Sequence, residues 1–463
     1  MMRANNKVVT FIKVVIFMLL GFAAALLVLY MVVGRDKGED KTEFTTYNGN
    51  DSGVSDGQEI PNSSGDEVAQ TVETVPESVA EDVAEAVTEG VTEGISEAVT
   101  EEATTEEITT EETTRSDERD PDVEKILSGM SIHEKCCQLF MVTPEALTGY
   151  SRVTEAGNVT KSSMQDYPVG GLIYFSNNID TTNQVKALLE NTSKYATEIS
   201  GFPMFLGVDE EGGNVARCAD KLDVPQLKDM YEYKSQGTST AYSNAKTIAT
   251  YLKDLGFNTD FAPVADTWSN SENTVIGKRA YSDNFSETAA LVSSAVSGFK
   301  DTGIVCSLKH FPGHGDTVTD SHDSAAFTEK TESQLMNEEY LAFKSGIDAG
   351  ADMVMIGHIT AKAISSEPAS VSKEVITGEL RGKLGYNGIV ITDALNMGAV
   401  SNEYTSSEIG VKCIEAGVDI ILMPTDFKSC LSGLEEAVNS GKVSEERINE
   451  SVRRILKVKL SMK

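Results

Sequence analysis

The chain has 463 residues, of which 40% are hydrophobic and 7% aromatic, and its formal net charge at pH 7 is −33. An excess of this size excludes nucleic acid and anionic lipid as binding surfaces, because both carry charge of the same sign. The six cysteines form no CxxC pair, so we expect small buried core residues rather than disulfides or zinc ligands. They are Cys136, Cys137, Cys218, Cys306, Cys413 and Cys430.

The first distinctive segment is residues 14–33, VVIFMLLGFAAALLVLYMVV, an apolar run without a charge. At about 1.5 Å per residue, a helix of this length crosses a bilayer core of about 30 Å. Arg3, Lys7 and Lys13 precede it, and basic flanks stay on the cytoplasmic side. We therefore predict that residues 1–37 hold an uncleaved single-pass anchor in the cell membrane, with the rest of the chain extracellular. A cleaved signal peptide is the alternative, but its apolar core is shorter and a small-residue cleavage site follows it.

The next segment, residues 38–118, is acidic and rich in Thr and Glu, with a degenerate Val/Thr/Glu repeat. Residues 38–120 contain 25 acidic and 3 basic side chains, so this stretch alone contributes −22 to the net charge. Low hydrophobicity combined with like charges predicts a disordered linker. We expect this linker to let the following domain extend away from the anchor, because about 80 residues of flexible coil span roughly 50 Å.

Eight apolar runs of strand length recur through the remaining segment, residues 119–463, and alternate with helix-like stretches such as 184–199 and 287–303. Near-continuous hydrophobic runs are typical of parallel strands that are buried on both faces. Eight such units in about 345 residues predict a single (β/α)8 barrel of the TIM type, with an open doubly wound sheet as the alternative. The eight runs are 137–142, 170–175, 203–208, 257–264, 303–308, 352–357, 388–393 and 418–423. In front of the first run, SIHE at 131–134 resembles a capping box and predicts a helix start.

Polar side chains follow the ends of several predicted strands. Because the carboxyl ends of barrel strands meet on one rim, we expect these side chains to form one active site. They are Asp209, Glu210 and Glu211 after the third strand, Lys309 and His310 after the fifth, His358 after the sixth and Asp393 after the seventh. For Glu211 and Asp419 taken alone, a helix cap or a rim salt bridge is the simpler interpretation.

Asp393 follows the largely apolar stretch GIVIT in GIVITDALNMGA. An ionised carboxylate in such a place is costly to bury unless a cation pairs with it, and we expect Lys309, Arg217 or Arg279 to do so. A carboxylate held in this way can act as a nucleophile. The alternative is a carboxylate that caps a helix beginning at Ala394.

The stretch KHFPGHGDTVTDSHDS, residues 309–324, contains three of the five histidines of the chain. Gly313 and Gly315 allow backbone angles that other residues avoid, and Pro312 fixes one bend. We therefore expect a shaped turn that leads into a mobile arm.

On that arm, Asp320 and His322 lie two residues apart. This spacing lets the carboxylate orient the imidazole, so that His322 can donate a proton and then take one back. Zinc is the competing interpretation, but the histidines match no HExxH or HxH spacing and Lys309 would repel a cation. We expect neither a metal nor a cofactor.

Together these motifs resemble the family 3 glycoside hydrolases, and more narrowly their bacterial β-N-acetylglucosaminidase branch. The resemblance covers residues 120–463 and rests on KHFPGHGDTVTDSH, VDEEGG (208–213), IGKRAYS (276–282), MVMIGH (353–358), ITDALNMGA (391–399) and AGVDIILMP (416–424). It implies a retaining mechanism in which Asp393 attacks the anomeric carbon while His322, paired with Asp320, acts as acid and then as base. The residues implied to hold the sugar are Asp209, Arg217, Arg279, Lys309 and His310, and we include His358 among the substrate-binding residues.

The resemblance, together with the predicted anchor, implies a membrane-tethered exo-β-N-acetylglucosaminidase whose substrate is the terminal GlcNAc of peptidoglycan fragments or of other glycans. A β-glucosidase, or a phosphorylase in which phosphate replaces water, stays open. A non-catalytic wall-binding module is the alternative outside the enzymes, although a binder needs no nucleophile and no positioned proton donor. One departure is Glu210, where the family commonly has glutamine, and we expect this added charge to shift pH preference or aglycone choice.

Overall fold

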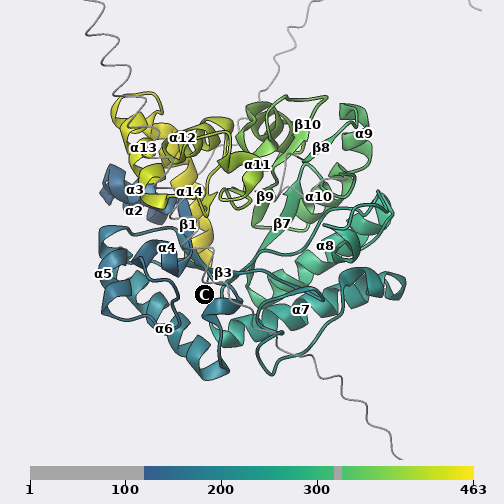
Figure 1. The fold of residues 1–463 in the computed structure, drawn as a ribbon, viewed down its shortest axis with the longest axis horizontal. Helices are drawn as coiled ribbons and strands as arrows, with labels where there is room; N and C mark the ends of the chain where they lie inside the picture. The colour runs from purple at the N-terminus through teal and green to yellow at the C-terminus, as the bar shows by residue number, and fades with distance from the viewer. Residues whose placement is uncertain (1–118, 318–325, 463) are drawn as a thin grey trace, which may run out of the picture. The chain divides into compact units, whose positions relative to one another are not determined.

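The structure, a computed structural model, describes residues 119–317 and 326–462 (Figure 1). The predicted anchor and the acidic linker lie outside the described residues, and so do Asp320 and His322. Within the two described ranges, none of the helices combines the length and the apolar character that a membrane span needs.

Eight parallel strands form one sheet in the order β11-β9-β7-β6-β3-β2-β1-β12. A parallel bridge between Ile391 and Ile420 connects the two outer strands of this order, so the sheet is a nearly closed barrel (Figure 1). This confirms the predicted barrel, and the open doubly wound alternative is wrong. The strands are β1 (Phe140–Val142), β2 (Gly171–Ile173), β3 (Phe205–Val208), β6 (Thr259–Asp260), β7 (Val305–Phe311), β9 (Met353–Ile356), β11 (Ile389–Thr392) and β12 (Ile421–Leu422).

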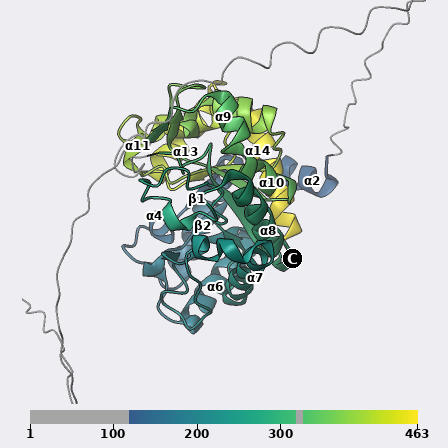
Figure 2. The ribbon, with the colours of Figure 1, turned by 90° about the vertical axis from the view of Figure 1, so that its right-hand side faces the viewer.

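The helices surround this barrel on its outside (Figures 1 and 2). Those that lead from one barrel strand towards the next include α6 (Thr182–Ser200), α7 (Thr238–Leu255), α8 (Phe285–Thr302), α10 (Tyr340–Asp348), the π-helix η6 (Glu374–Lys383) and α12 (Ser406–Ala416). The shorter or terminal helices are α2 (Pro121–Gly129), α3 (Ile132–Gln138), α4 (Pro144–Thr148), α5 (Asn158–Asp166), α9 (Glu332–Asn337), α11 (Gly398–Ser401), α13 (Phe427–Asn439) and α14 (Glu445–Ser461).

The local signals in the sequence explain several of these boundaries. The capping box is confirmed, because the hydroxyl of Ser131 accepts a hydrogen bond from the backbone N–H of Glu134 while the Glu134 carboxylate accepts one from the N–H of Ser131. The helix that starts there runs through Gln138, so the first predicted strand began too early. The first and last described helices, α2 and α14, lie side by side (Figure 2), and Arg453 Nε is 2.6 Å from Glu124 Oε1.

Apolar side chains fill the barrel and the layer between the strands and the helices. Every residue of β1, β2, β3, β9 and β11 is buried, as continuous hydrophobic runs predict. All six cysteines are free and buried, which confirms the expectation of core thiols. Asp419 is also buried just before β12 and pairs with Arg381 (2.6 Å) and Arg454 (3.0 Å), so the salt-bridge interpretation is correct for this residue.

Candidate active site

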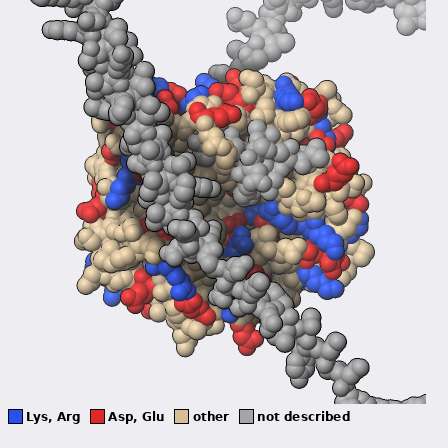
Figure 3. All heavy atoms as spheres, in the orientation of Figure 1, with Lys and Arg blue, Asp and Glu red and all other residues tan. Residues whose placement is uncertain are grey.

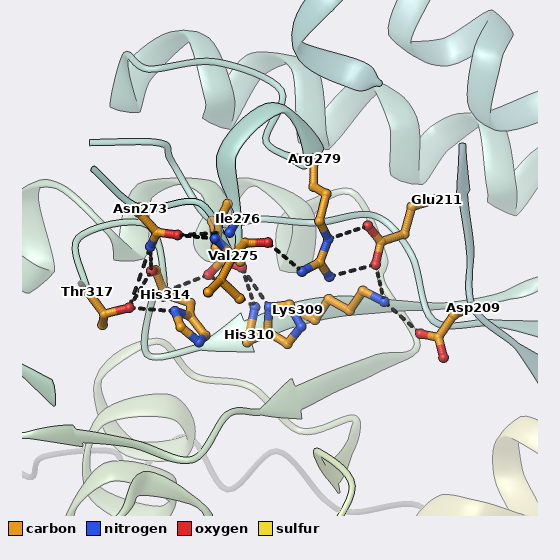
Figure 4. A network of polar contacts seen from close by, with 11 residues as sticks. Asp209, Glu211, Asn273, Val275, Ile276, Arg279, Lys309, His310, His314 and Thr317 are labelled. Atoms are coloured by element: carbon orange, nitrogen blue, oxygen red, sulfur yellow. Dashed lines mark hydrogen bonds and ion pairs between the residues drawn. The ribbon is translucent and has the colours of Figure 1, made fainter. Parts of the chain in front are cut away.

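The side chains that follow β3, β6, β7, β9 and β11 meet at one end of the barrel, as expected for parallel strands. Strand β7 extends through Phe311, so Lys309 and His310 lie within the strand rather than after it. On the face drawn in Figure 3, acidic and basic side chains are interspersed among other residues. Figure 4 shows the polar network that these side chains form.

Lys309 lies at the centre of a chain of alternating charges (Figure 4). Its Nζ atom is 2.7 Å from Asp209 Oδ1 and 2.6 Å from Glu211 Oε1. Arg279 continues the chain with two parallel hydrogen bonds of 2.8 Å to the carboxylate of Glu211. Burial alone raises the pKa of Glu211, but Arg279 and Lys309 together hold it well below its usual range. Glu211 therefore forms a salt bridge, as expected, but this salt bridge is part of the site.

His310 is oriented by a buried carboxylate that the sequence analysis did not single out. Asp266 Oδ2 accepts a hydrogen bond from His310 Nδ1 at 2.7 Å, and the same carboxylate accepts the backbone N–H groups of His310 (3.1 Å) and His314 (2.7 Å). Burial raises the pKa of Asp266, but His310 and His314 outweigh this effect and the net shift is downward. The pairing turns Nε2 of His310 away from Asp266.

The turn after β7 has the predicted shape, although one glycine is needed for a different reason. Gly313 has a φ of +124°, which favours glycine, and its N–H donates to the carbonyl of His310 at 2.8 Å. At Gly315 the constraint is space, because an added Cβ would lie 1.6 Å from the carbonyl oxygen of Thr267. A side chain cannot be placed there without moving the backbone.

Further hydrogen bonds hold the turn as far as Thr317. Its hydroxyl is 2.6 Å from Nδ1 of His314, and the amide of Asn273 donates to the carbonyl of His314 at 2.7 Å (Figure 4). The chain is thus anchored immediately before residues 318–325. The pairing of Asp320 with His322 falls on those residues and stays a prediction.

Asp393 follows β11 and is partly buried. Burial raises its pKa, but His310, His358 and Lys309 outweigh burial, and the net shift is downward. Lys309 acts on Asp393 only through its charge, because its ion pairs are with Asp209 and Glu211, and Arg279 pairs with Glu211. Asp393 Oδ1 accepts the N–H of Ala394 at 2.7 Å, but the next helix, α11, begins only at Gly398, so the helix-cap alternative is wrong.

His358 is held next to Asp393 by hydrogen bonds at both ring nitrogens. Nδ1 is 2.8 Å from the hydroxyl of Ser370, and Nε2 is 3.0 Å from the carbonyl oxygen of Ala394. The ring therefore links the residue that follows Asp393 to the segment before η6.

Arg217 lies directly after β5 (Val215–Ala216), the second strand of a hairpin with β4 (Glu210–Gly212). Its Nε atom is buried and has no hydrogen-bond partner among the residues that the structure describes. A buried donor of this kind marks a place where a ligand or a water is expected. Glu210 points away from the ion network, into the protein beneath this hairpin, and the expected effect of its charge on pH preference or aglycone choice stays a prediction.

Sequence reasoning missed Asp266, Asn273, Thr317 and Ser370. Asp266 had a usable signal, because it follows the apolar run FAPVA as Asp393 follows its own run. The other three give none: Thr317 contacts His314 within the same turn, and Asn273 and Ser370 act through contacts between separate loops. In the described part of the chain, no group of three or more His, Cys, Asp or Glu side chains is placed to hold a metal ion.

A barrel with charged side chains gathered at one rim is an architecture that many enzyme classes share, so the comparisons with known proteins decide the class. The model of the glycosyl hydrolase family 3 N-terminal domain matches residues 131–458. The chain therefore belongs to glycosyl hydrolase family 3.

Among curated proteins, the chain is 34% identical over 274 residues to the beta-hexosaminidase of Psychromonas ingrahamii, covering 58% of this chain and 79% of that protein. It is 32% identical over 322 residues to beta-hexosaminidase A of Pseudoalteromonas piscicida, covering 64% of this chain. The match spans about half of the length of that second relative, 54%.

Among solved structures, the family 3 β-N-acetylglucosaminidase from Paenibacillus sp. str. FPU-7 is similar with a TM-score of 0.68 and 36% identity, covering 72% of this chain and 63% of that one. A family 3 member from Mycobacterium smegmatis has a TM-score of 0.64 and 27% identity, covering 72% of this chain and 98% of that one.

Proposed function

We propose that the chain is a retaining exo-β-N-acetylglucosaminidase that hydrolyses terminal β-linked GlcNAc from peptidoglycan fragments or other glycans. The observation that carries this proposal is Asp393, a carboxylate at the active rim whose pKa is kept below its ordinary value by His310, His358 and Lys309. An ionised carboxylate in this position has the chemistry of a nucleophile. The names of the relatives, beta-hexosaminidase and β-N-acetylglucosaminidase, support the choice of sugar.

In the first step, Asp393 attacks the anomeric carbon and a covalent glycosyl-enzyme forms as the bond to the leaving group breaks. The leaving oxygen takes a proton from His322, which Asp320 orients. In the second step, the same histidine removes a proton from water, the water attacks the anomeric carbon, and Asp393 is released as a carboxylate. Retaining enzymes commonly use a second carboxylic acid in this role, and the histidine replaces it here.

The placement of the other histidines supports the assignment of the proton donor. His310 is bound to Asp266, His314 contacts Thr317, and His358 is held by Ser370 and Ala394. Each of these rings has a structural partner. Thr317 lies at the same end of the barrel as Asp393, and the segment that carries His322 follows it in the sequence.

The sugar is bound by the charged network next to Asp393. Asp209 and Lys309 form hydrogen bonds to hydroxyl groups, Arg279 fixes the geometry of the network through Glu211, and Arg217 presents its buried Nε to the ligand. His310 contacts the sugar close to the reacting carbon. His358 is fully buried and bound at both ring nitrogens, so it acts by holding the segment next to Asp393 rather than by direct contact. A pocket with paired charges of both signs suits a neutral, hydroxyl-rich ligand.

The proposal includes the location of the enzyme. Residues 1–37 anchor the chain in the cell membrane, residues 38–118 act as an extracellular linker, and residues 119–463 form the catalytic domain. The apolar run over 14–33 and the acidic composition of the linker support this arrangement. Separating membranes from soluble protein tests it, because the full chain is expected in the membrane fraction and a chain that lacks residues 1–37 is not.

Trapping of the covalent intermediate tests the mechanism. A slowly hydrolysed aryl β-N-acetylglucosaminide is incubated with the full chain, and peptides are analysed by mass spectrometry. The account predicts a sugar adduct on the peptide that contains Asp393, and no adduct in an Asp393→Ala variant. An adduct on another carboxylate, or turnover by Asp393→Ala at the wild-type rate, contradicts the proposal.

A further inference from the structure

Glu210 occupies an unusual position between two residues of the proposed site. Asp209 and Glu211 on either side of it both contact Lys309. Neighbouring side chains of an extended strand point to opposite faces, so Glu210 points away from the sugar, and it is fully buried. A buried carboxylate without a cation needs several hydrogen-bond donors to be tolerated.

Glu210 has those donors, and they come from two different parts of the fold, the segment after β5 and α7. Its Oε2 accepts the backbone N–H of Cys218 at 2.7 Å. Its Oε1 accepts the N–H of Ala219 at 2.9 Å and the hydroxyl of Tyr251, on α7, at 2.8 Å. The backbone N–H of Glu210 itself donates to Asp260 Oδ1, on β6, at 3.0 Å. One residue thus joins β4, the end of the hairpin, α7 and β6.

The two amides that Glu210 binds are those of the residues immediately after Arg217. Fixing the backbone at Cys218 and Ala219 fixes the direction in which the preceding side chain leaves the chain. Arg217 has a buried Nε without a protein partner in the described ranges, so its direction decides whether it reaches a ligand.

We propose that Glu210 is a positioning residue that sets Arg217, and with it Asp209 and Glu211, for sugar binding. This inference rests on the proposed function, because it assumes that Arg217 contacts the substrate. It assigns Glu210 no contact with the sugar and no proton transfer.

In this chain, where Cys218, Ala219 and Tyr251 all donate to the same side chain, a carboxylate suits this place better than the glutamine that the family commonly has. Three donors converge on two oxygens, and both oxygens of a carboxylate accept. A glutamine has one acceptor oxygen, and its NH2 group would face at least one of the N–H groups. The Glu210→Gln variant therefore keeps the shape of the side chain but leaves a buried amide N–H without an acceptor.

The test compares Glu210→Gln in the full chain with a matched control, Tyr174→Phe. Tyr174 is buried like Tyr251 and donates to Thr192 Oγ1 at 3.2 Å, between the end of β2 and α6. Its loss removes a buried hydrogen bond without touching the hairpin. The measurements are the melting temperature, hydrogen exchange at the amides of Cys218 and Ala219, the separate values of kcat and KM on an aryl β-N-acetylglucosaminide, and the affinity for free GlcNAc.

For Glu210→Gln we expect faster exchange at both amides, weaker binding of GlcNAc and a fall in kcat/KM of roughly 10- to 100-fold. For Tyr174→Phe we expect wild-type hydrogen exchange at the amides of Cys218 and Ala219 and unchanged kinetics, even if its melting temperature falls as much as that of Glu210→Gln. A Glu210→Gln variant that binds and turns over sugar like the wild type overturns the inference. So does an equal kinetic loss in Tyr174→Phe.

The same experiment separates this inference from the proposed function. If the wild type prefers an aryl β-glucoside, the substrate assignment fails, and the comparison of variants is made with glucose and that glucoside. A wild type that binds neither sugar overturns both proposals. If the wild type acts on the N-acetyl sugar and the Glu210→Gln variant has the same kinetics and affinity, only the inference about Glu210 is overturned.

Discussion

Nδ1 of His310 lies 2.7 Å from Oδ2 of Asp266, and the same carboxylate accepts the backbone N–H groups of both His310 and His314. One buried side chain thus fixes a ring at the active rim and the turn that follows it. The two residues are 44 positions apart and lie on neighbouring strand ends, so the barrel itself brings them together.

The first prediction concerns this pair. Asp266→Asn keeps the shape but replaces one acceptor oxygen with a donor NH2 group, which then faces N–H donors. Because His310 loses its fixed orientation next to Asp393, we expect kcat/KM to fall about 100-fold while most of the stability is kept. Steady-state kinetics and a thermal melt check this. Asp283→Asn, at an exposed rim carboxylate, is the control, and an equal loss there counts against the role of Asp266.

The second prediction concerns the proton donor. Replacing His322 with Gln removes the proposed acid, so substrates with poor leaving groups are expected to lose about 10²- to 10⁴-fold in rate. Activated aryl glycosides need little protonation at the leaving oxygen, so their first step is expected to lose far less. The ratio of the two rates is measured in the wild type and in the variant. Equal losses on both kinds of substrate contradict the assignment.

The third prediction concerns the stability of the ion network. Glu211→Gln removes a buried negative charge and leaves Arg279 and Lys309 without it, and breaking a buried pair in this way costs about 3 to 5 kcal/mol. The free energy of unfolding by denaturant checks this. The control is Glu198→Gln, which breaks an exposed pair with Lys161 and is expected to change stability little. Similar losses in the two variants would falsify the claim that the network is tightly coupled.

The fourth prediction concerns a buried lysine on α14, the last described helix. Lys459, on α14, is fully buried, and its Nζ is 2.6 Å from Gln138 Oε1 with the rings of Phe202 and Phe205 close by. Burial lowers its pKa to about 7. Above pH 7 the unfolded chain therefore binds a proton that the folded chain lacks, so the free energy of unfolding rises with pH up to the ordinary lysine pKa of about 10.4.

The measurement is the difference in unfolding free energy between the wild type and Lys459→Met at pH 7 and pH 9. This difference is expected to move in favour of the wild type by about 1.4 kcal/mol per pH unit. Lys457→Met, at an exposed position two residues earlier on α14, should give a difference that does not depend on pH. A pH-independent difference for Lys459→Met as well argues against a buried neutral amine.

The barrel could be predicted because its strands are continuous apolar runs, and such runs report burial on both faces directly. The residues at the strand ends followed from the same pattern, which is why Asp209, Lys309, His310, His358 and Asp393 were found. Partners were harder to predict, because Asp266 and Ser370 contact the site only through the folded arrangement of strands and loops. The direction of Glu210 could not be predicted, since a run of three acidic residues does not reveal which one faces inward.

The most direct test of the account is the rate at which the full chain releases the chromophore from an aryl β-N-acetylglucosaminide and from the matching aryl β-glucoside, with and without added phosphate. The account predicts strong preference for the N-acetyl sugar and free GlcNAc as the product in both buffers. Preference for the glucoside, release of a sugar 1-phosphate, or no turnover of either substrate would contradict it.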